Sequence, residues 1–364
     1  MTWHPAGTGA PATPCVAALV TGGTGFLGAS LTRRLLFDGV RVRVLARSLA
    51  KAKPLADLGA EITVGDITDE AAVQTAVDGM QVVFHLAGPL LLPGIPAVEY
   101  RQTHVLGTEL VLDCCEKASG FERLVYCSTT GVLGVTGDKP VGEEALFRPA
   151  NVYELAKARA EAEVRRRCRD GFPAVIARPG LVYGPGDIHL LPFFQVILRR
   201  RFRPIGRRKV WLHPVYIDDI TEALVQCGQR RAALSECFHL AGKEPVTISD
   251  LADAIARAEG TRLPPGYIPV CAARTVAGLA GRLPAGLKHR VPLTRSRLDF
   301  LTHSRVYDVS KALRMLGFAA ATDLSTGVAR TVAWYRQRGY LPPEATSRAS
   351  TGKEVRQCEF GITS

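Results

Sequence analysis

The chain of 364 residues carries 46 Lys and Arg against 34 Asp and Glu, which gives a formal net charge of +12. This length allows a large buried core and two lobes, and the lack of an internal repeat or of an apolar run long enough to span a bilayer excludes repeat arrays and membrane-spanning proteins. The nine cysteines show neither C-x-x-C nor Cys/His ligand spacing, and we find no signal segment. We therefore expect reduced thiols, a cytoplasmic protein and no metal site.

A glycine-rich turn, TGGTGFLG, follows the first predicted strand at residues 16–20. The spacing of Gly22, Gly25 and Gly28 suits a turn from strand to helix. The first glycine permits a tight turn, the second lets the backbone approach a pyrophosphate, and the third lets the helix pack closely on the strand. The helix predicted over residues 26–38 would direct its N-terminal amides at the phosphates. This context favours a dinucleotide site over a glycine-rich surface turn.

The end of the second predicted strand, residues 40–45, bears on the choice of cofactor. An NAD site usually has Asp or Glu there to bind the ribose 2′-hydroxyl, whereas this strand leads into Arg47 and Ser48. A cation and a hydroxyl suit a 2′-phosphate, so the pattern favours NADP, with NAD as the other possibility. The alternative is that Arg47 is merely solvated, because basic residues are common throughout the chain.

Two further predicted strands end in residues suited to the same ligand. The run at 61–68 ends in a carboxylate beside the expected adenine, and the run at 82–88 ends under the expected nicotinamide ribose. We expect His85, inside the second run, to be a packed strand residue rather than a base. The predicted contacts at these two ends are Asp66, Ile67, Leu86, Ala87 and Gly88.

Tyr153 and Lys157 stand at positions i and i+4 of a helical pattern, which places both side chains on one face. A free phenol, with a pKa of about 10, is a poor acid-base group at neutral pH, but an adjacent ammonium and an oxidised nicotinamide favour the phenolate. A lone Y-x-x-x-K pattern is usually an exposed helix pair. Here the pattern indicates a catalytic pair because of the preceding strand, residues 123–130, whose hydroxyl-bearing end could hold a substrate carbonyl oxygen.

Over about residues 15–340 these motifs resemble the extended short-chain dehydrogenase/reductases of the NAD-dependent epimerase/dehydratase superfamily. The matching motifs in chain order are TGGTGFLG, GDITD, HLAG, HVLGT, YCSTTGVLG, YELAK, ARPGLVYGPGD and VYIDDI. The resemblance implies an α/β fold, with a Rossmann-type doubly wound parallel sheet and a smaller C-terminal substrate lobe. It also implies that Tyr153 and Lys157 are the catalytic pair and that Thr129, chosen by spacing over Ser128 and Thr130, is the third member.

The same resemblance implies which residues contact the cofactor and which segment covers it. Residues 178–187 would close over the nicotinamide and the substrate. His104 departs from the family pattern, because members usually have an Asn there that supports the helix and a proton relay; the histidine either supplies a hydrogen bond or is a structural substitution. The implied cofactor contacts are Gly22, Gly25, Phe26, Leu27, Gly28, Arg47, Asp66, Ile67, Leu86, Ala87, Gly88, Tyr153, Lys157 and Pro179.

Within this family the chain looks closest to the 3β-hydroxysteroid and sterol dehydrogenase branch. Nucleotide-sugar epimerases typically have an Asn where Leu181 stands and an Arg where Leu212 stands, although the cations at 207–209 could substitute. We expect an NAD(P)-dependent oxidoreductase that interconverts a secondary alcohol and a ketone on a bulky apolar, 3β-hydroxysteroid-like substrate. The alternatives are a nucleotide-sugar epimerase or dehydratase and a non-catalytic nucleotide-binding scaffold.

The motifs divide the chain into two lobes with polar ends. We expect a cofactor lobe over residues 15–186 with a return segment at 210–243, and a substrate lobe made of 187–209 and 244–342. Residues 1–14 and 343–364 are expected to be flexible, from their composition. The apolar and basic stretch at 267–287 is a candidate substrate lid or membrane-touching helix.

The positive charge is concentrated in two places. Residues 199–209 hold seven cations, and a second cluster lies at 165–169. Neither contains the interleaved aromatics or recognised module of a nucleic-acid binder, so we expect no nucleic-acid partner. A solvated basic face and peripheral contact with an anionic membrane both remain open. The expected partners are a small apolar substrate and a second copy of the chain in a homodimer.

Overall fold

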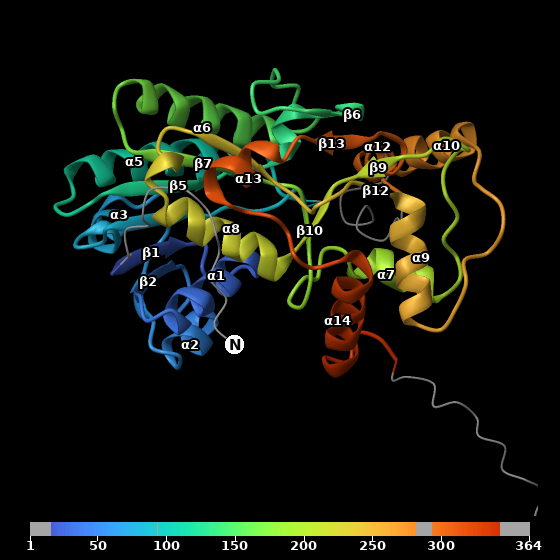
Figure 1. Ribbon diagram of the computed structural model, residues 1–364, viewed down its shortest axis with the longest axis horizontal. Coiled ribbons are helices and arrows are strands. Elements are labelled where there is room, and N and C mark those ends of the chain that lie inside the picture. The colour runs from blue at the N-terminus through green and yellow to red at the C-terminus, as the bar shows by residue number, and fades with distance from the viewer. Residues whose placement is uncertain (1–15, 93, 282–292, 343–364) are drawn as a thin grey trace, which may run out of the picture.

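A seven-stranded sheet forms the centre of the computed structural model, which describes residues 16–92, 94–281 and 293–342 (Figure 1). The strand order is β11-β7-β5-β4-β1-β2-β3, and every neighbouring pair is parallel. This is the doubly wound Rossmann-type sheet that the sequence predicts. The strands are β1 (Ala17–Thr21), β2 (Arg41–Ala46), β3 (Glu61–Val64), β4 (Val82–His85), β5 (Arg123–Cys127), β7 (Ala174–Pro179) and β11 (Cys237–Leu240).

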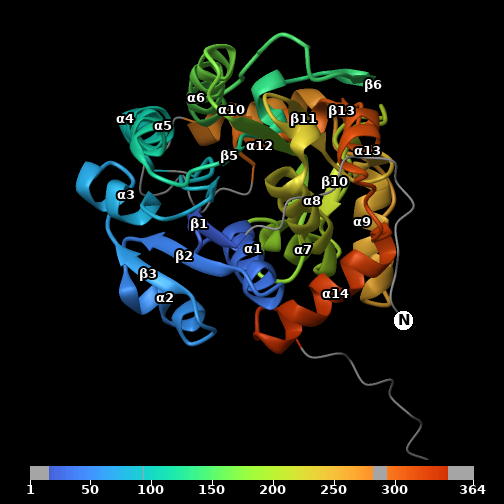
Figure 2. The same cartoon turned by 60° about the vertical axis from the view of Figure 1, so that its left-hand side comes forward.

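Helices cover both faces of this sheet (Figure 2). One face packs against α1 (Phe26–Phe37), α2 (Leu49–Ala56) and α8 (Ile217–Gln229). The other packs against α3 (Glu70–Val77), α5 (Gly107–Lys117) and α6 (Val152–Arg169).

Strand β1 shows why the sheet is buried on both sides. Successive side chains of a strand point to opposite faces, so Ala18 and Val20 join the cluster under α1 while Ala17 and Leu19 join the cluster under α3. All five residues of the strand are buried. A strand between two helical layers needs an apolar run instead of an alternating one, which is the pattern seen at its position in the sequence.

The connection from β1 leads through α1 to β2, whereas β4 lies on the opposite side of β1. This reversal opens a crevice outside the carboxyl ends of β1 and β4, where doubly wound sheets bind their ligands. The turn from Gly22 to Gly25 lies at this point, and Gly22 adopts a left-handed φ of 72° that glycine tolerates best.

The remaining elements form a second group beside the carboxyl edge of the sheet (Figure 1). Two short pairs connect it with the sheet: β8 (Leu181–Tyr183) pairs with β10 (Pro214–Tyr216), and β6 (Gly137–Val141) pairs with β13 (Arg305–Tyr307). The other members are α7 (Leu191–Leu198), β9 (Trp211–Leu212), β12 (Val246–Thr247), α9 (Ile248–Ala258), α10 (Val270–Gly281), α12 (Arg295–Thr302) and α14 (Leu324–Gln337), whereas α13 (Ser310–Leu316) packs on β11 and α8 of the sheet.

The predicted return segment, 210–243, starts at β9, which pairs with β12, and runs through α8 to β11 at the edge of the main sheet. The predicted flexible ends, 1–14 and 343–364, and residues 282–287 of the lid candidate lie outside the described residues.

We expect Gly28→Ala to destabilise the fold, because the added Cβ would meet the carbonyl oxygen of Gly22, and neither backbone can move without opening the turn. Overpacking of this kind costs about 1–3 kcal/mol, measurable as a lower urea midpoint. Gly278→Ala on α10 is the matched control: a Cβ there meets open space, so the variant should be neutral or more stable by up to about 1 kcal/mol. Equal unfolding free energies for the two variants would contradict the packing argument.

Candidate active site

The predicted site residues converge because parallel strands end at one edge of the sheet. The turn after β1, the segment after β4 and the hydroxyl-bearing segment after β5 all leave this edge. The neighbouring strand β7 ends there in Pro179, whose carbonyl oxygen accepts a hydrogen bond from Thr130. Helix α6 lies across the same region and carries Tyr153 and Lys157.

The structure brings Thr129 close enough to Tyr153 for its hydroxyl to lower the pKa of the phenol. The neighbouring hydroxyls are occupied elsewhere: Ser128 donates to Glu161 at 2.6 Å and Thr130 donates to the Pro179 carbonyl oxygen at 3.0 Å. Thr129 also accepts from the backbone N–H of Gly131 at 3.1 Å, which fixes its side chain. Of the three consecutive hydroxyls, the one chosen by sequence spacing is the one beside the phenol.

The sequence suggests that Lys157 lowers the pKa of Tyr153, but burial dominates in the chain alone. Burial raises the pKa of Tyr153 well above its ordinary value, the nearby Cys127 thiol raises it further, and the Thr129 hydroxyl opposes both. The phenol is fully protonated at neutral pH in this state. The lowering expected from Lys157 together with an oxidised nicotinamide stays a prediction for the cofactor-bound state.

Lys157 is buried beneath the site. Its Nζ donates to the carbonyl oxygen of Cys127 at 2.7 Å and lies 5.0 Å from the centre of the Tyr126 ring. Burial lowers the pKa of Lys157 to about 8, while Cys127 and Glu161 oppose that change. The amine is thus held at the end of β5, one helical turn below the phenol.

A buried ion pair behind Lys157 is absent from the sequence-based prediction. Arg178 and Glu161 are both fully buried and form a bidentate pair, with Arg178 Nε at 3.0 Å from Glu161 Oε2. The expectation that the covering segment starts at Arg178 is wrong, because Arg178 lies inside β7 and faces this carboxylate. A signal was present in the sequence, since Glu161 follows Lys157 by four residues and shares its helix face.

His104 lies beside Tyr153 in the π-helical turn Arg101–Leu106. Its Nε2 donates to the carbonyl oxygen of Pro89 at 2.9 Å, and its ring centre lies 5.5 Å from that of Tyr153. Burial lowers its pKa to about 3, so the ring is neutral. The ring also fills the space above Gly88, where any Cβ would overlap it. His104 therefore supports the segment after β4 through a hydrogen bond and packing.

His85 is a packed strand residue, as the sequence predicts. Its Nδ1 and Nε2 pair with the hydroxyls of Thr21 at 2.8 Å and Thr108 at 2.9 Å. Burial lowers its pKa to about 3, because the ring is enclosed between β1 and α5. With both nitrogens bonded, His85 holds β4 against β1 and is unsuited to act as a base.

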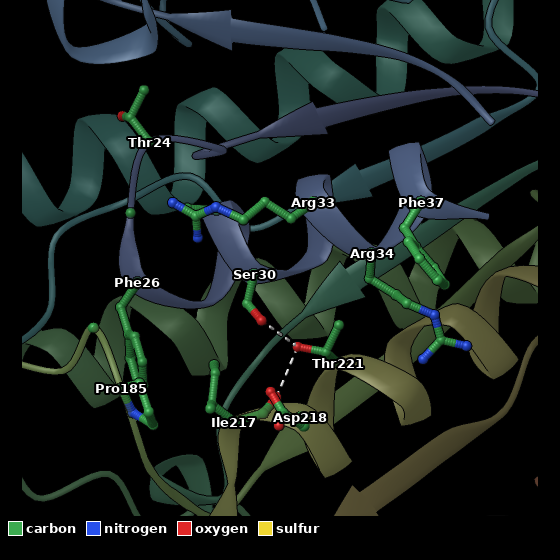
Figure 3. Close-up of a pocket in the computed structure, with 13 residues that line it drawn as sticks. Thr24, Phe26, Ser30, Arg33, Arg34, Phe37, Pro185, Ile217, Asp218 and Thr221 are labelled. Atoms are coloured by element: carbon green, nitrogen blue, oxygen red, sulfur yellow. Dashed lines mark hydrogen bonds between the residues drawn. The ribbon is translucent and has the colours of Figure 1, made fainter. Parts of the chain in front are cut away.

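The glycine turn forms a cradle at the start of α1. Its N-cap residue is Gly25, and no side chain of the described residues caps the helix, so the first-turn N–H groups of Phe26 and Leu27 point outward unscreened. A cavity of about 680 Å³ begins beside this turn and runs between α1 and α8 (Figure 3). Phe26 and Pro185 close one end of it, where Phe26 also lies against Gly186. The glycine turn and the N-terminus of α1 fit the pyrophosphate of a dinucleotide, whereas the cavity is not lined by Thr129, Tyr153 or Lys157.

The predicted adenine end is more open. Arg47 is 79% exposed, with Nη1 at 4.0 Å from Oδ2 of Asp66. The hydroxyl of Ser48, expected to help bind a 2′-phosphate, instead accepts from the backbone N–H of Lys51 and caps α2. Ile67 is buried under Gly107, so its side chain is not available to a ligand.

The low pKa of Lys157 gives a pH dependence of stability. Between its folded value of about 8 and an unfolded value of about 10.4, the unfolded chain binds more protons, so the free energy of unfolding rises with pH in this window. We expect the cofactor-free wild type to gain about 2–3 kcal/mol over Lys157→Met between these limits. Urea unfolding at each pH measures the difference. The exposed Lys51→Met is the control, and parallel profiles for wild type and Lys157→Met would contradict the burial of a charged amine.

Comparisons with known proteins identify the family and the fold. The NAD dependent epimerase/dehydratase family model matches residues 18–239. The 2-alkyl-3-oxoalkanoate reductase of Stenotrophomonas maltophilia is 30% identical over 86% of this chain and 97% of that protein. The 3 beta-hydroxysteroid dehydrogenase/Delta 5-->4-isomerase of Mycobacterium tuberculosis is 31% identical over 82% of this chain and 85% of that protein. The crystal structure of gox2253 superposes with a TM-score of 0.74 at 29% sequence identity, and the match covers 90% of this chain and 99% of that one. The chain belongs to the NAD-dependent epimerase/dehydratase family, the extended short-chain dehydrogenase/reductases.

Proposed function

We propose that the protein interconverts a secondary alcohol and a ketone on a bulky apolar, 3β-hydroxysteroid-like substrate, with NADP as the preferred cofactor. The observation that carries this proposal is the placement of Thr129 beside Tyr153, one helical turn from the buried Lys157. A phenol, a hydroxyl and an amine in this order are suited to moving a proton to or from an oxygen. Family membership supplies the hydride chemistry.

Each residue has a separate task. The nicotinamide would exchange a hydride with the substrate carbon when bound. Thr129 would orient the substrate oxygen, and Tyr153 would donate its proton to that oxygen during reduction or accept it during oxidation. Lys157 would hold the ribose and lower the cost of forming the phenolate. The protonated state of Tyr153 in the chain alone suits proton donation to a ketone.

The substrate assignment rests on apolar residues where a phosphate site needs charge. Leu212 is buried in the main hydrophobic cluster, and Leu181 packs against the same cluster. The nearby cations are directed elsewhere: Arg207 lies over the Tyr267 ring and Arg208 pairs with Asp138. A diphosphate would lack fixed donors at these positions, whereas a rigid apolar substrate gains about 25 cal/mol per Å² buried. Relatives that act on 3-oxoalkanoates and 3β-hydroxysteroids support this direction.

A panel of substrates tests the proposal. Steroids, long-chain ketones and nucleotide sugars are incubated with NADPH or NADP, and turnover is followed by nicotinamide absorbance and product mass. We expect net cofactor consumption with the apolar compounds. Tyr153→Phe is the control, and its rate should fall by about 10² to 10⁴ with cofactor affinity retained. Conversion of a nucleotide sugar without net absorbance change, with all apolar compounds inert, would overturn the proposal in favour of an epimerase.

Arg47 tests the cofactor preference separately. Its exposed guanidinium is free to turn from Asp66 toward a 2′-phosphate, so Arg47→Ala should weaken NADPH binding by about 10-fold or more and leave NADH binding within about two-fold. Fluorescence titration of both cofactors measures this. Lys51→Ala, which removes an exposed cation from the neighbouring helix, should change neither affinity. Equal losses for NADPH and NADH would place Arg47 outside the pocket.

A further inference from the structure

The cationic segment 199–209 and helix α10 form one structural unit, although about sixty residues separate them in the chain. Ile205 and Ile268 form a parallel bridge, in which Gly206 N–H donates to the Ile268 carbonyl oxygen and Ile268 N–H donates to that of Pro204, each at 2.8 Å. Arg203 adds a bond to the carbonyl oxygen of Pro265. Figure 1 shows the segment after α7 rising beside α9 to reach α10. We call this unit, residues 199–209 and 260–281, the basic rim.

The basic rim holds most of the excess charge of the protein. Its first stretch has seven cations and its second has Arg262 and Arg274, and neither contains an Asp or Glu. Three quarters of the net charge of +12 therefore lies in fewer than a tenth of the residues. The seven cations of the first stretch are all exposed. Arg208 has a carboxylate partner, Asp138, which is itself outside the rim.

Apolar side chains are exposed among these cations. Ala273 and Ala277 of α10 face inward and pack against Ile205. A different side of the helix presents Val276, 49% exposed, and Leu279, 58% exposed. These two aliphatic side chains lie next to a cationic segment without carboxylates. Together they form a basic and apolar surface of the kind that lies at a bilayer interface.

We propose that the basic rim binds the surface of an anionic lipid bilayer. The charge complements anionic headgroups, and Val276 and Leu279 can enter the headgroup boundary. A nucleic acid fits less well, because stacking platforms need free aromatic rings and the guanidinium of Arg207 lies over the ring of Tyr267, 4.9 Å from its centre. None of the described helices is both long and apolar enough to cross a membrane, so the contact proposed is peripheral. Such a contact places the substrate lobe next to the phase in which apolar ketones and sterols dissolve.

Vesicle sedimentation of the full chain tests this surface. Phosphatidylcholine vesicles with and without about 30% phosphatidylglycerol are compared at low and high salt, with duplex DNA as a parallel ligand. We expect binding to the anionic vesicles alone, lost at high salt. Replacing Arg199, Arg201 and Lys209 by Gln should weaken it about 100-fold, at about five-fold per cation. The matched triple of Lys51, Arg169 and Arg231 to Gln, on remote exposed positions, should bind as the wild type does.

A second variant checks the apolar part. The double variant Val276→Gln, Leu279→Gln should bind vesicles more weakly than the wild type. The triple variant of Arg199, Arg201 and Lys209 should keep the wild-type turnover of a water-soluble ketone, so loss of vesicle binding is separable from loss of catalysis. Binding to DNA in preference to vesicles, equal binding to neutral vesicles, or unchanged vesicle binding by either rim variant would each overturn it. Failure of the substrate panel leaves the vesicle result standing, because sedimentation needs no turnover.

Discussion

The ion pair between Arg178 and Glu161 is the interaction on which the geometry of the site depends. Both charges are fully enclosed, and a buried charge that loses its partner destabilises a fold by about 3–5 kcal/mol. The pair therefore fixes β7 against α6. Ser128 donates to the same carboxylate and adds the end of β5 to the junction. One buried carboxylate thus joins two strands and a helix that come from separate parts of the chain.

This junction sets the rotation of α6 about its axis. Glu161 follows Lys157 by one turn and Tyr153 by two, on the same face of the helix. When the carboxylate meets Arg178, the amine reaches the end of β5 and the phenol reaches Thr129. A slip of one residue would turn the helix by about 100° and separate both contacts at once. The ion pair and the proton-transfer group are therefore parts of one arrangement, although only the latter faces the crevice.

Local patterns allowed the fold class to be predicted, and long-range packing explains what was missed. The glycine spacing at 22–28 and the apolar runs before and after it define strand, turn and helix within one short stretch, so the parallel sheet followed from them. The sequence shows that Lys157 is near Tyr153, but not that burial outweighs its charge. Arg178 looked like the start of a loop because its partner lies on another element, and a charge inside a buried strand is recognisable only when that partner is in place.

The anchor of Lys157 is a main-chain atom, the carbonyl oxygen of Cys127. Every amino acid offers the same oxygen, so the contact persists whichever side chain occupies position 127, provided that β5 keeps its register. The thiol can therefore be exchanged for a small neutral group without detaching the amine. Substitutions at this position would test the packing around the thiol but would not remove the hydrogen bond to the backbone. The position of the Lys157 amine at the end of β5 thus depends on the backbone, and replacing the side chain of residue 127 leaves that contact in place.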